Sequence, residues 1–265
     1  MPSSRIPKRI HYIWFGGKPL TPLAERCIAS WKKFCPDYEI IRWDESNFDE
    51  GGNRYFQEAI AAKKWAFASD YARLKVLVEN GGFYMDTDVE LLKPLDRFLS
   101  DEALSGFETE SRIPTGLMAC RDSFPLFERL LHDYDDRSFI KPNGQPDLTT
   151  NVTLITQACL EEGLVLNGEK QTVAGFTIYP KDWFCPKDHD TGRIELTENS
   201  YAIHHFDGSW LPRGLTLYQK EKAILTKRFG WLPLGILKGV ALASACVKDG
   251  STEPYKAWKG RRSHE

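Results

Sequence analysis

Apolar residues near the start of the chain follow first a strand-like and then a helix-like pattern. Residues 9–15 (RIHYIWF) are β-branched and aromatic and end at a Gly-Gly pair, and residues 38–43 (YEIIRW) form a second run of this kind. Both runs predict buried strands. Between them, residues 23–34 carry apolar side chains at helical spacing behind Thr21, a typical N-cap.

The clearest helix is predicted over Lys64 to Asn80, where apolar residues recur at i, i+4, i+7 and i+11. Gly81-Gly82 provides its stop. A short apolar strand (residues 83–85) then leads into Asp86-Thr87-Asp88, and a second one follows it (89–92). The pattern further predicts helices over 126–133 and 149–162 and a late strand over 201–206.

A strand–helix–strand opening is typical of α/β proteins with a mostly parallel central sheet flanked by helices. After Pro212 the pattern changes to a basic helix over 215–228 and an apolar stretch over 231–247, which Pro, Lys and Gly interrupt. That stretch is marginal for crossing a bilayer and predicts an interfacial or packed helix. We therefore expect an α/β domain over 1–212 and a mainly helical segment over 213–265.

Charge is distributed unevenly along the 265 residues. The net charge of −2 gives no reason to expect nucleic acid as a partner. Residues 213–265, however, contain 11 Lys and Arg against 4 Asp and Glu, a net of +7, which leaves −9 for the remainder. Attraction to an anionic membrane surface accounts for such a segment, and so does a solvated basic face.

The six cysteines are scattered, and none lies in a Cys-x-x-Cys pair or at a zinc-site spacing. This pattern favours a reducing compartment. The first ten residues lack the apolar region of a signal peptide. These features predict a cytoplasmic protein, with peripheral attachment to the inner face of the membrane as the role of the basic segment.

Asp86 and Asp88 are the first candidates for chemistry. Carboxylates at i and i+2 point to the same side of an extended chain, so they can share one hard cation such as Mn²⁺ or Mg²⁺. A cation held there can neutralise a diphosphate. Acidic pairs also occur in ordinary surface loops, but here an apolar strand is predicted on both sides of the pair.

Three further places offer functional side chains. Asp70 and Arg73 stand at i and i+3 on the predicted helix, where they form either a surface ion pair or contacts to sugar hydroxyls and phosphate. Trp14 is either a core residue or a platform for a nucleotide base at the sheet's carboxyl edge. The third place is His204-His205 with Asp207 and Ser209, where alternation lets only one histidine reach the site.

Three segments together resemble a known family: IPKRIHYIWFGG, WAFASDYARLKVLVENGGFYMDTDVELLKPL and YAIHHFDGSW. They resemble the Asp-x-Asp sugar-binding glycosyltransferases, including the capsular and outer-chain family 32. They are more distantly similar to the glucosylating domains of clostridial toxins. The resemblance covers residues 5–212 and is most specific in the block that contains S-D-x-x-R, G-G-x-Y and D-x-D.

The resemblance implies a GT-A fold and retaining transfer of a hexose from a UDP-linked or related nucleotide sugar. The acceptor would be a polysaccharide or lipid-linked oligosaccharide, as in capsule synthesis. Metal binding would fall to Asp86, Asp88, Asp207 and Ser209. Donor contacts are implied for the following residues: Trp14 (base), Asp70, Arg73 and Tyr84 (sugar pocket), Asn151 (a polar donor-site position), His204 (diphosphate) and Trp210 (lid).

Other functions remain open at this point. A non-catalytic protein that binds sugar nucleotides or glycans could use the same fold, although the intact acidic and basic residues argue against a decayed site. A toxin-like enzyme that glycosylates a protein is a third possibility. A metal-dependent phosphohydrolase is disfavoured because the sequence shows neither a basic cradle nor an additional set of carboxylates.

Overall fold

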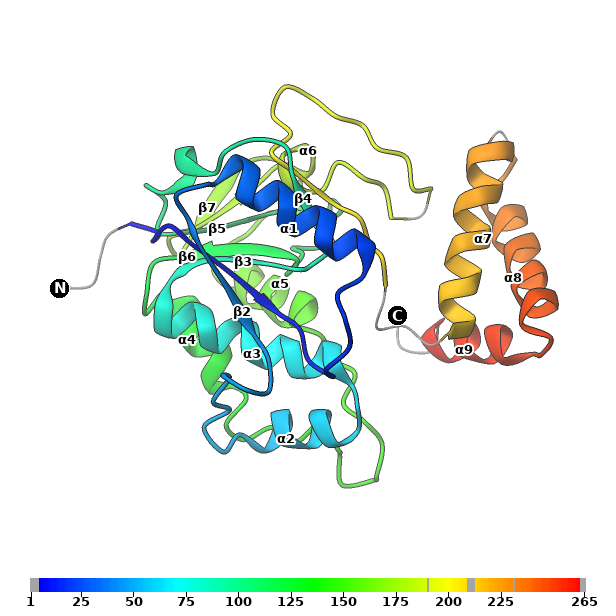
Figure 1. Ribbon diagram of the computed structural model, residues 1–265, viewed down its shortest axis with the longest axis horizontal. Coiled ribbons are helices and arrows are strands. Elements are labelled where there is room, and N and C mark those ends of the chain that lie inside the picture. The colour runs from blue at the N-terminus through cyan, green and yellow to red at the C-terminus, as the bar shows by residue number, and fades with distance from the viewer. Residues whose placement is uncertain (1–4, 190, 209–212, 231, 263–265) are drawn as a thin grey trace. The chain divides into compact units, whose positions relative to one another are not determined.

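The computed structural model describes residues 5–189, 191–208, 213–230 and 232–262, which form two compact units (Figure 1). The first unit is Met1–Pro186 with Leu196–His205, and the second is Lys187–Glu195 with Phe206–Glu265. A functional division of the chain at residue 212 remains a proposal.

A seven-stranded sheet forms the centre of the first unit, in the order β2-β1-β3-β6-β5-β8-β7. Its strands are β1 (Arg9–Ile13), β2 (Glu39–Trp43), β3 (Gly82–Met85), β5 (Ala103–Gly106), β6 (Leu117–Cys120), β7 (Gln171–Val173) and β8 (Phe176–Tyr179). β1 pairs in parallel with both β2 and β3, and β5 with β8, whereas β6 runs antiparallel to β3 and β5, and β7 to β8. A separate two-stranded sheet pairs β4 (Val89–Leu91) with β9 (Ala202–His204).

Two apolar clusters cover the two faces of the large sheet. The helices of this unit are α1 (Pro22–Phe34), α2 (Arg54–Ala61), α3 (Trp65–Asn80), α4 (Pro125–His132), α5 (Asn151–Glu161) and α6 (Lys181–Phe184), with a 3-10 turn η1 (Asp96–Phe98). Residues of α2, α3, α4 and α5 belong to one cluster, and those of α1 and α6 to the other. The predicted α/β class with a sheet between helices is therefore confirmed.

Local signals set the helix boundaries near the site. The Thr21 hydroxyl accepts a hydrogen bond from Ala24 N at 3.1 Å, as its predicted role as N-cap requires. α3 ends at Gly81, whose φ of 61° is strained for any residue with a Cβ. The chain then enters β3 at once, so α3 and β3 present their side chains to a common site.

The described part of the second unit contains three helices, α7 (Arg213–Phe229), α8 (Leu234–Asp249) and α9 (Glu253–Arg262). Its core includes Leu215 and Tyr218 from α7 and Ala241 and Ala245 from α8. The predicted mainly helical C-terminal segment is thus confirmed. No helix within the described ranges combines the length and hydrophobicity needed to cross a membrane.

Candidate active site

Asp86 and Asp88 lie in a tight turn between β3 and β4. Val89 N donates to Asp86 O at 2.9 Å and closes the turn, while Asp86 N donates to Gly116 O at 2.7 Å. The apolar strands on both sides are buried, so the turn is held at two ends. The acidic pair is consequently part of a fixed backbone segment.

His204 lies beside Asp88 because β9 pairs antiparallel with β4, with His204 opposite Val89. Its Nε2 is 3.4 Å from Asp88 Oδ1. The next residue faces elsewhere: the His205 ring contacts Glu90 Oε2 at 2.8 Å. The His204 ring therefore joins the acidic pair, while His205 contacts it through its backbone N–H, which donates to Asp88 O at 2.9 Å.

The His204 ring is enclosed on its other sides. Its Nδ1 lies 3.9 Å from Cys185 Sγ, and a Cβ added at Gly116 would approach its Cε1 to 2.8 Å. Burial by itself lowers the pKa of His204, but the charge and hydrogen bond of Asp88, together with the contact to Cys185, raise that pKa well above its usual value. The imidazolium–carboxylate pair is thus the favoured state of this side of the site.

Arg73 lies beside Asp86 and is 5% exposed. Its Nη1 donates to Thr115 O at 2.7 Å and to Thr115 Oγ1 at 2.8 Å, and its Nη2 lies 3.4 Å from Asp86 Oδ1. The guanidinium also covers the Tyr84 ring at 4.7 Å. Burial alone would lower the pKa of Arg73, but Asp86, Tyr84 and Asp70 raise it, so Arg73 stays protonated.

Asp70 is 7% exposed and ionically paired to Arg73, with 3.5 Å between Oδ1 and Nη2. Asn151 N donates to its Oδ2 at 3.2 Å, and Asn151 Nδ2 donates to its main-chain oxygen at 2.6 Å. Burial raises the pKa of Asp70, and Arg73 and the Asn151 N–H oppose that rise. Asp70 therefore depends on Arg73 as its counter-charge.

Tyr84 is 1% exposed, and its hydroxyl donates to Asp86 Oδ1 at 2.7 Å. Burial raises its pKa well above the usual value, so the phenol keeps its proton and remains a donor. In this structure the Tyr84 hydroxyl orients Asp86, and the Tyr84 ring packs against the Arg73 guanidinium. Lining the sugar pocket stays a prediction for this residue.

The acidic pair and His204 fit a divalent cation. Asp86, Asp88 and His204 each offer a ligand atom within 4.8 Å of the others, a spacing at which these groups could hold one ion between them. Carboxylate oxygens with one imidazole are a reasonable set for Mn²⁺. Asp70 and Asp86 share the Arg73 guanidinium, and Asp88 pairs with His204. Once His204 gives up its proton to bind a metal, the three carboxylates exceed the positive charge of Arg73, which favours a bound cation.

The remaining predicted residues are placed as follows. Trp14 directly follows β1, is half-buried, and donates from Nε1 to Lys18 O at 2.6 Å. Asp207 is exposed and belongs to the second unit, so its role as a metal ligand stays a prediction. Ser209 and Trp210 lie outside the described residues.

Two site residues had no sequence signal, Thr115 and Tyr134. Thr115 holds Arg73 from the loop before β6, and the Tyr134 hydroxyl donates to Asn151 Oδ1 at 2.6 Å. Both act through partners far away in the chain. Only a three-dimensional arrangement reveals such residues.

Comparison with known proteins gives one family match. Residues 22–105 match the model described as the glycosyltransferase sugar-binding region containing a DXD motif. No curated protein matches the chain. The matched range contains Asp70, Arg73, Tyr84, Asp86 and Asp88, which the structure brings together.

Three solved structures are similar to parts of the chain. The first, a PaToxG glycosyltransferase, is 23% identical with a TM-score of 0.45, over 60% of this chain and 70% of that one. A transferase with two cysteine-to-serine substitutions is 11% identical with a TM-score of 0.40, over 57% and 85%. A glycosyltransferase involved in glycosylation of the major capsid of PBCV-1 is 11% identical with a TM-score of 0.33, over 65% and 82%.

The resemblance predicted from the sequence is confirmed for the block that contains the acidic pair. Over residues 22–105 this chain is similar to the sugar-binding region of glycosyltransferases that contain a DXD motif.

Proposed function

We propose that this protein is a retaining glycosyltransferase that moves a hexose from a UDP-linked sugar to a polysaccharide or lipid-linked oligosaccharide acceptor. The observation that carries the proposal is the convergence of Asp86, Asp88 and His204, with Arg73 and Asp70 beside Asp86. Such a site combines a place for a cation with polar groups for sugar hydroxyls. A diphosphate leaving group needs the cation, and hexose recognition needs the polar groups.

In this proposal Asp86, Asp88 and His204 hold Mn²⁺ or Mg²⁺. A divalent cation held by these residues would supply the positive charge that a departing β-phosphate needs as the glycosidic bond breaks. Without a metal, His204 pairs with Asp88. To serve as a ligand, His204 must first release its proton, so metal binding would displace that ion pair. Asp207 and Ser209 are candidates for completing the coordination, and Trp210 for closing over the donor.

Sugar recognition is assigned to Asp70 and Arg73, with Trp14 under the nucleotide base. Thr115 accepts two hydrogen bonds from the guanidinium, so Arg73 is held in one orientation before a ligand binds. Asp70 is held by Arg73 and by Asn151 N, which disfavours it as a covalent nucleophile. We therefore propose front-face departure without a glycosyl–enzyme; a trapped adduct in a mass spectrum would contradict this step.

The enzyme activity is tested by incubating the full chain with a panel of nucleotide sugars, glycan acceptors and Mn²⁺. Release of the nucleoside diphosphate that depends on both acceptor and metal is the expected result. If nucleotide sugars bind but no combination turns over, the protein is a binding module on the same fold.

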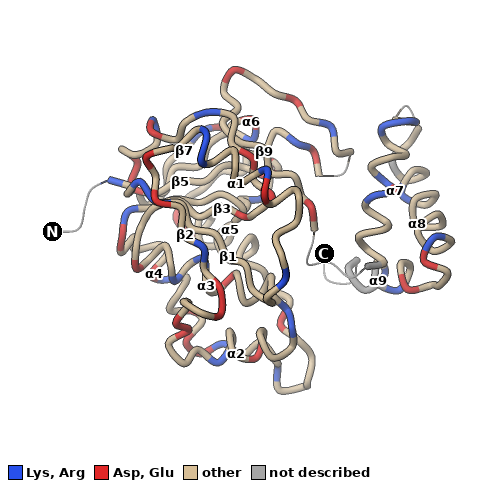
Figure 2. Tube along the Cα trace, in the orientation of Figure 1, with Lys and Arg blue, Asp and Glu red and all other residues tan. Residues whose placement is uncertain are grey.

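Membrane association of the second unit is the remaining part of the proposal. α8 buries Leu237 on one side, while Ile236, Val240 and Val247 lie on another with 52%, 49% and 81% of their surface exposed. A helix with apolar side chains on two sides is typical of a helix that contacts the protein core on one side and another apolar surface on the other. Figure 2 shows lysine and arginine along α7 of the same unit. An anionic bilayer surface at the inner face of the membrane suits both features.

Cosedimentation with vesicles that contain phosphatidylserine tests this association. Val240→Glu should weaken binding severalfold, because it places a carboxylate among lipid headgroups of the same charge. Leu196→Glu is the matched control, since Leu196 is a 55% exposed apolar residue of the first unit. Equal binding by the wild type and Val240→Glu would contradict membrane association through α8.

A further inference from the structure

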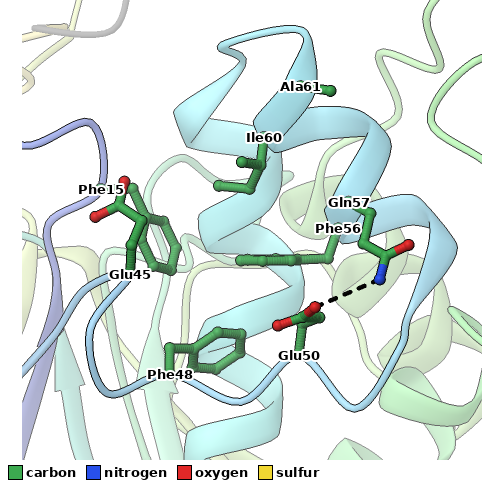
Figure 3. Close-up of a pocket in the computed structure, with 8 residues that line it drawn as sticks. All are labelled: Phe15, Glu45, Phe48, Glu50, Phe56, Gln57, Ile60 and Ala61. Carbon is green, nitrogen blue, oxygen red and sulfur yellow. Dashed lines mark hydrogen bonds between the residues drawn. The ribbon is translucent and has the colours of Figure 1, made fainter.

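A cavity lies at the carboxyl ends of β1 and β2, and neither Asp86 nor Asp88 lines it. Its volume is about 310 Å³, roughly that of ten waters in the liquid and near the lower bound for small-molecule sites. Phe15 from the end of β1, Phe48 from the loop after β2, and Phe56 and Ile60 from α2 form its apolar wall (Figure 3). Ligands of α/β proteins commonly bind at this edge of the sheet.

The cavity is distinct from the predicted base platform. Successive residues of an extended chain face opposite sides, and Phe15 belongs to the apolar cluster with α2 and α3, whereas Trp14 packs against the other cluster. A molecule in the cavity therefore lies on the opposite side of the chain from one stacked on Trp14.

The aromatic rings form a continuous wall. Ring centroids are 5.8 Å apart for Phe15 and Phe48, 5.4 Å for Phe15 and Phe56, and 5.1 Å for Phe48 and Phe56. All three are at most 9% exposed, so their positions are fixed by packing. Preformed aromatic surfaces attract cations as well as apolar groups.

The polar groups at the cavity carry one sign of charge. Glu45 and Glu50 line it together with Gln57, and none of the eight lining residues is Lys, Arg or His (Figure 3). Glu45 Oε1 accepts from Gly16 N at 2.5 Å, and Glu50 Oε1 accepts from Gln57 Nε2 at 3.4 Å. Neither carboxylate forms an ion pair with another residue in the described ranges.

From this combination we infer a binding site for a small organic cation, an ammonium group that carries short alkyl substituents. The aromatic wall takes the alkyl groups and the positive charge, and the two carboxylates balance that charge. A phosphate or carboxylate ligand is disfavoured because no basic side chain lines the cavity. The site would hold an alkylammonium part of an acceptor or of a separate effector, rather than the nucleotide sugar.

Choline and its neutral isostere 3,3-dimethylbutan-1-ol provide a matched pair of probes. Their affinities for the full chain can be measured by saturation-transfer difference NMR. Choline should bind with a dissociation constant roughly tenfold lower than that of the alcohol, and added salt should reduce this preference. Equal affinity of the two probes, or no binding of either, would overturn the inference.

Glu50→Gln and Glu45→Gln remove one charge each and keep an oxygen that accepts the hydrogen bond from Gln57 or Gly16 N. Each variant should weaken choline binding severalfold and leave binding of the alcohol unchanged. Glu39→Gln is the control, because Glu39 is an exposed carboxylate on β2 that does not line the cavity. Choline binding that is unaffected in both pocket variants, or equally reduced in the control, would contradict the assignment.

Discussion

Substituting Gly116 by alanine tests whether His204 belongs to the cation site. The added Cβ would lie 2.8 Å from His204 Cε1, 3.1 Å from Nδ1 and 3.2 Å from Nε2, whereas ordinary contacts begin at 3.4 Å. The ring must therefore move by about 0.6 Å (3.4 minus 2.8 Å), or the backbone must yield. Gly116 does not have a positive φ, so alanine adds no backbone strain of its own.

A shift of this size matters because His204 Nε2 is only 3.4 Å from Asp88 Oδ1. Displacing a metal ligand or its support typically lowers metal affinity by about 10- to 100-fold, equivalent to roughly 1.4–2.7 kcal/mol. We expect the dissociation constant for Mn²⁺, measured by calorimetry or electron paramagnetic resonance, to rise by that factor in Gly116→Ala. The melting temperature should change little by comparison.

A double-mutant cycle gives the control. In a His204→Ala background the clash partner is absent, so Gly116→Ala should have no further effect on Mn²⁺ affinity. Gly239→Ala, on an exposed part of α8 where an added Cβ meets nothing within 4 Å, should leave affinity unchanged in either background. Unaltered Mn²⁺ binding by Gly116→Ala, or an equal loss with and without His204, would refute the reasoning.

Two further predictions concern buried charge. Arg73→Met should lower the free energy of unfolding in urea melts by about 3–5 kcal/mol, since it leaves Asp70 without its counter-charge. Adding Asp70→Asn should recover part of that loss. If the losses of the two single variants simply add in the double variant, the pairing is contradicted. His11 accepts from Trp43 Nε1 at 3.1 Å and its Nε2 lies 2.9 Å from Gly81 O, and burial lowers its pKa to about 4. Between about pH 6.5 and 4 the unfolded chain binds a proton on His11 that the folded protein does not. The free energy of unfolding should therefore decrease as the pH falls through that window, by up to roughly 3 kcal/mol more in the wild type than in His11→Gln. Parallel pH profiles of the wild type and His11→Gln would argue against a buried neutral ring.

Much of the first unit follows from local sequence patterns. The helix predicted over Lys64 to Asn80 forms from Trp65 to Asn80, and the strand after Gly81-Gly82 begins where the glycines place it. Periodicity and caps act over a few residues, which explains why these elements were predictable. The antiparallel β6, between β3 and β5, carries no such signal, because strand order depends on contacts between distant segments.

The site divides in the same way. Asp70, Arg73, Asp86 and Asp88 lie within one short stretch, so spacing alone placed them on a helix and the turn after the next strand. His204 reaches Asp88 only through the pairing of β4 with β9, across more than a hundred residues. The sequence suggested that one histidine of the pair would face the site, but fixing its partner required the register of that small sheet.

In the proposed function, Asp88 helps to hold a cation against the diphosphate of a nucleotide sugar. The most direct test of this role is metal-dependent turnover of a nucleotide sugar by Asp88→Asn, which keeps the size of the side chain and removes its charge. We predict that turnover falls by at least about 100-fold while the thermal unfolding curve stays close to that of the wild type. A folded Asp88→Asn protein with wild-type turnover and Mn²⁺ dependence would contradict the account.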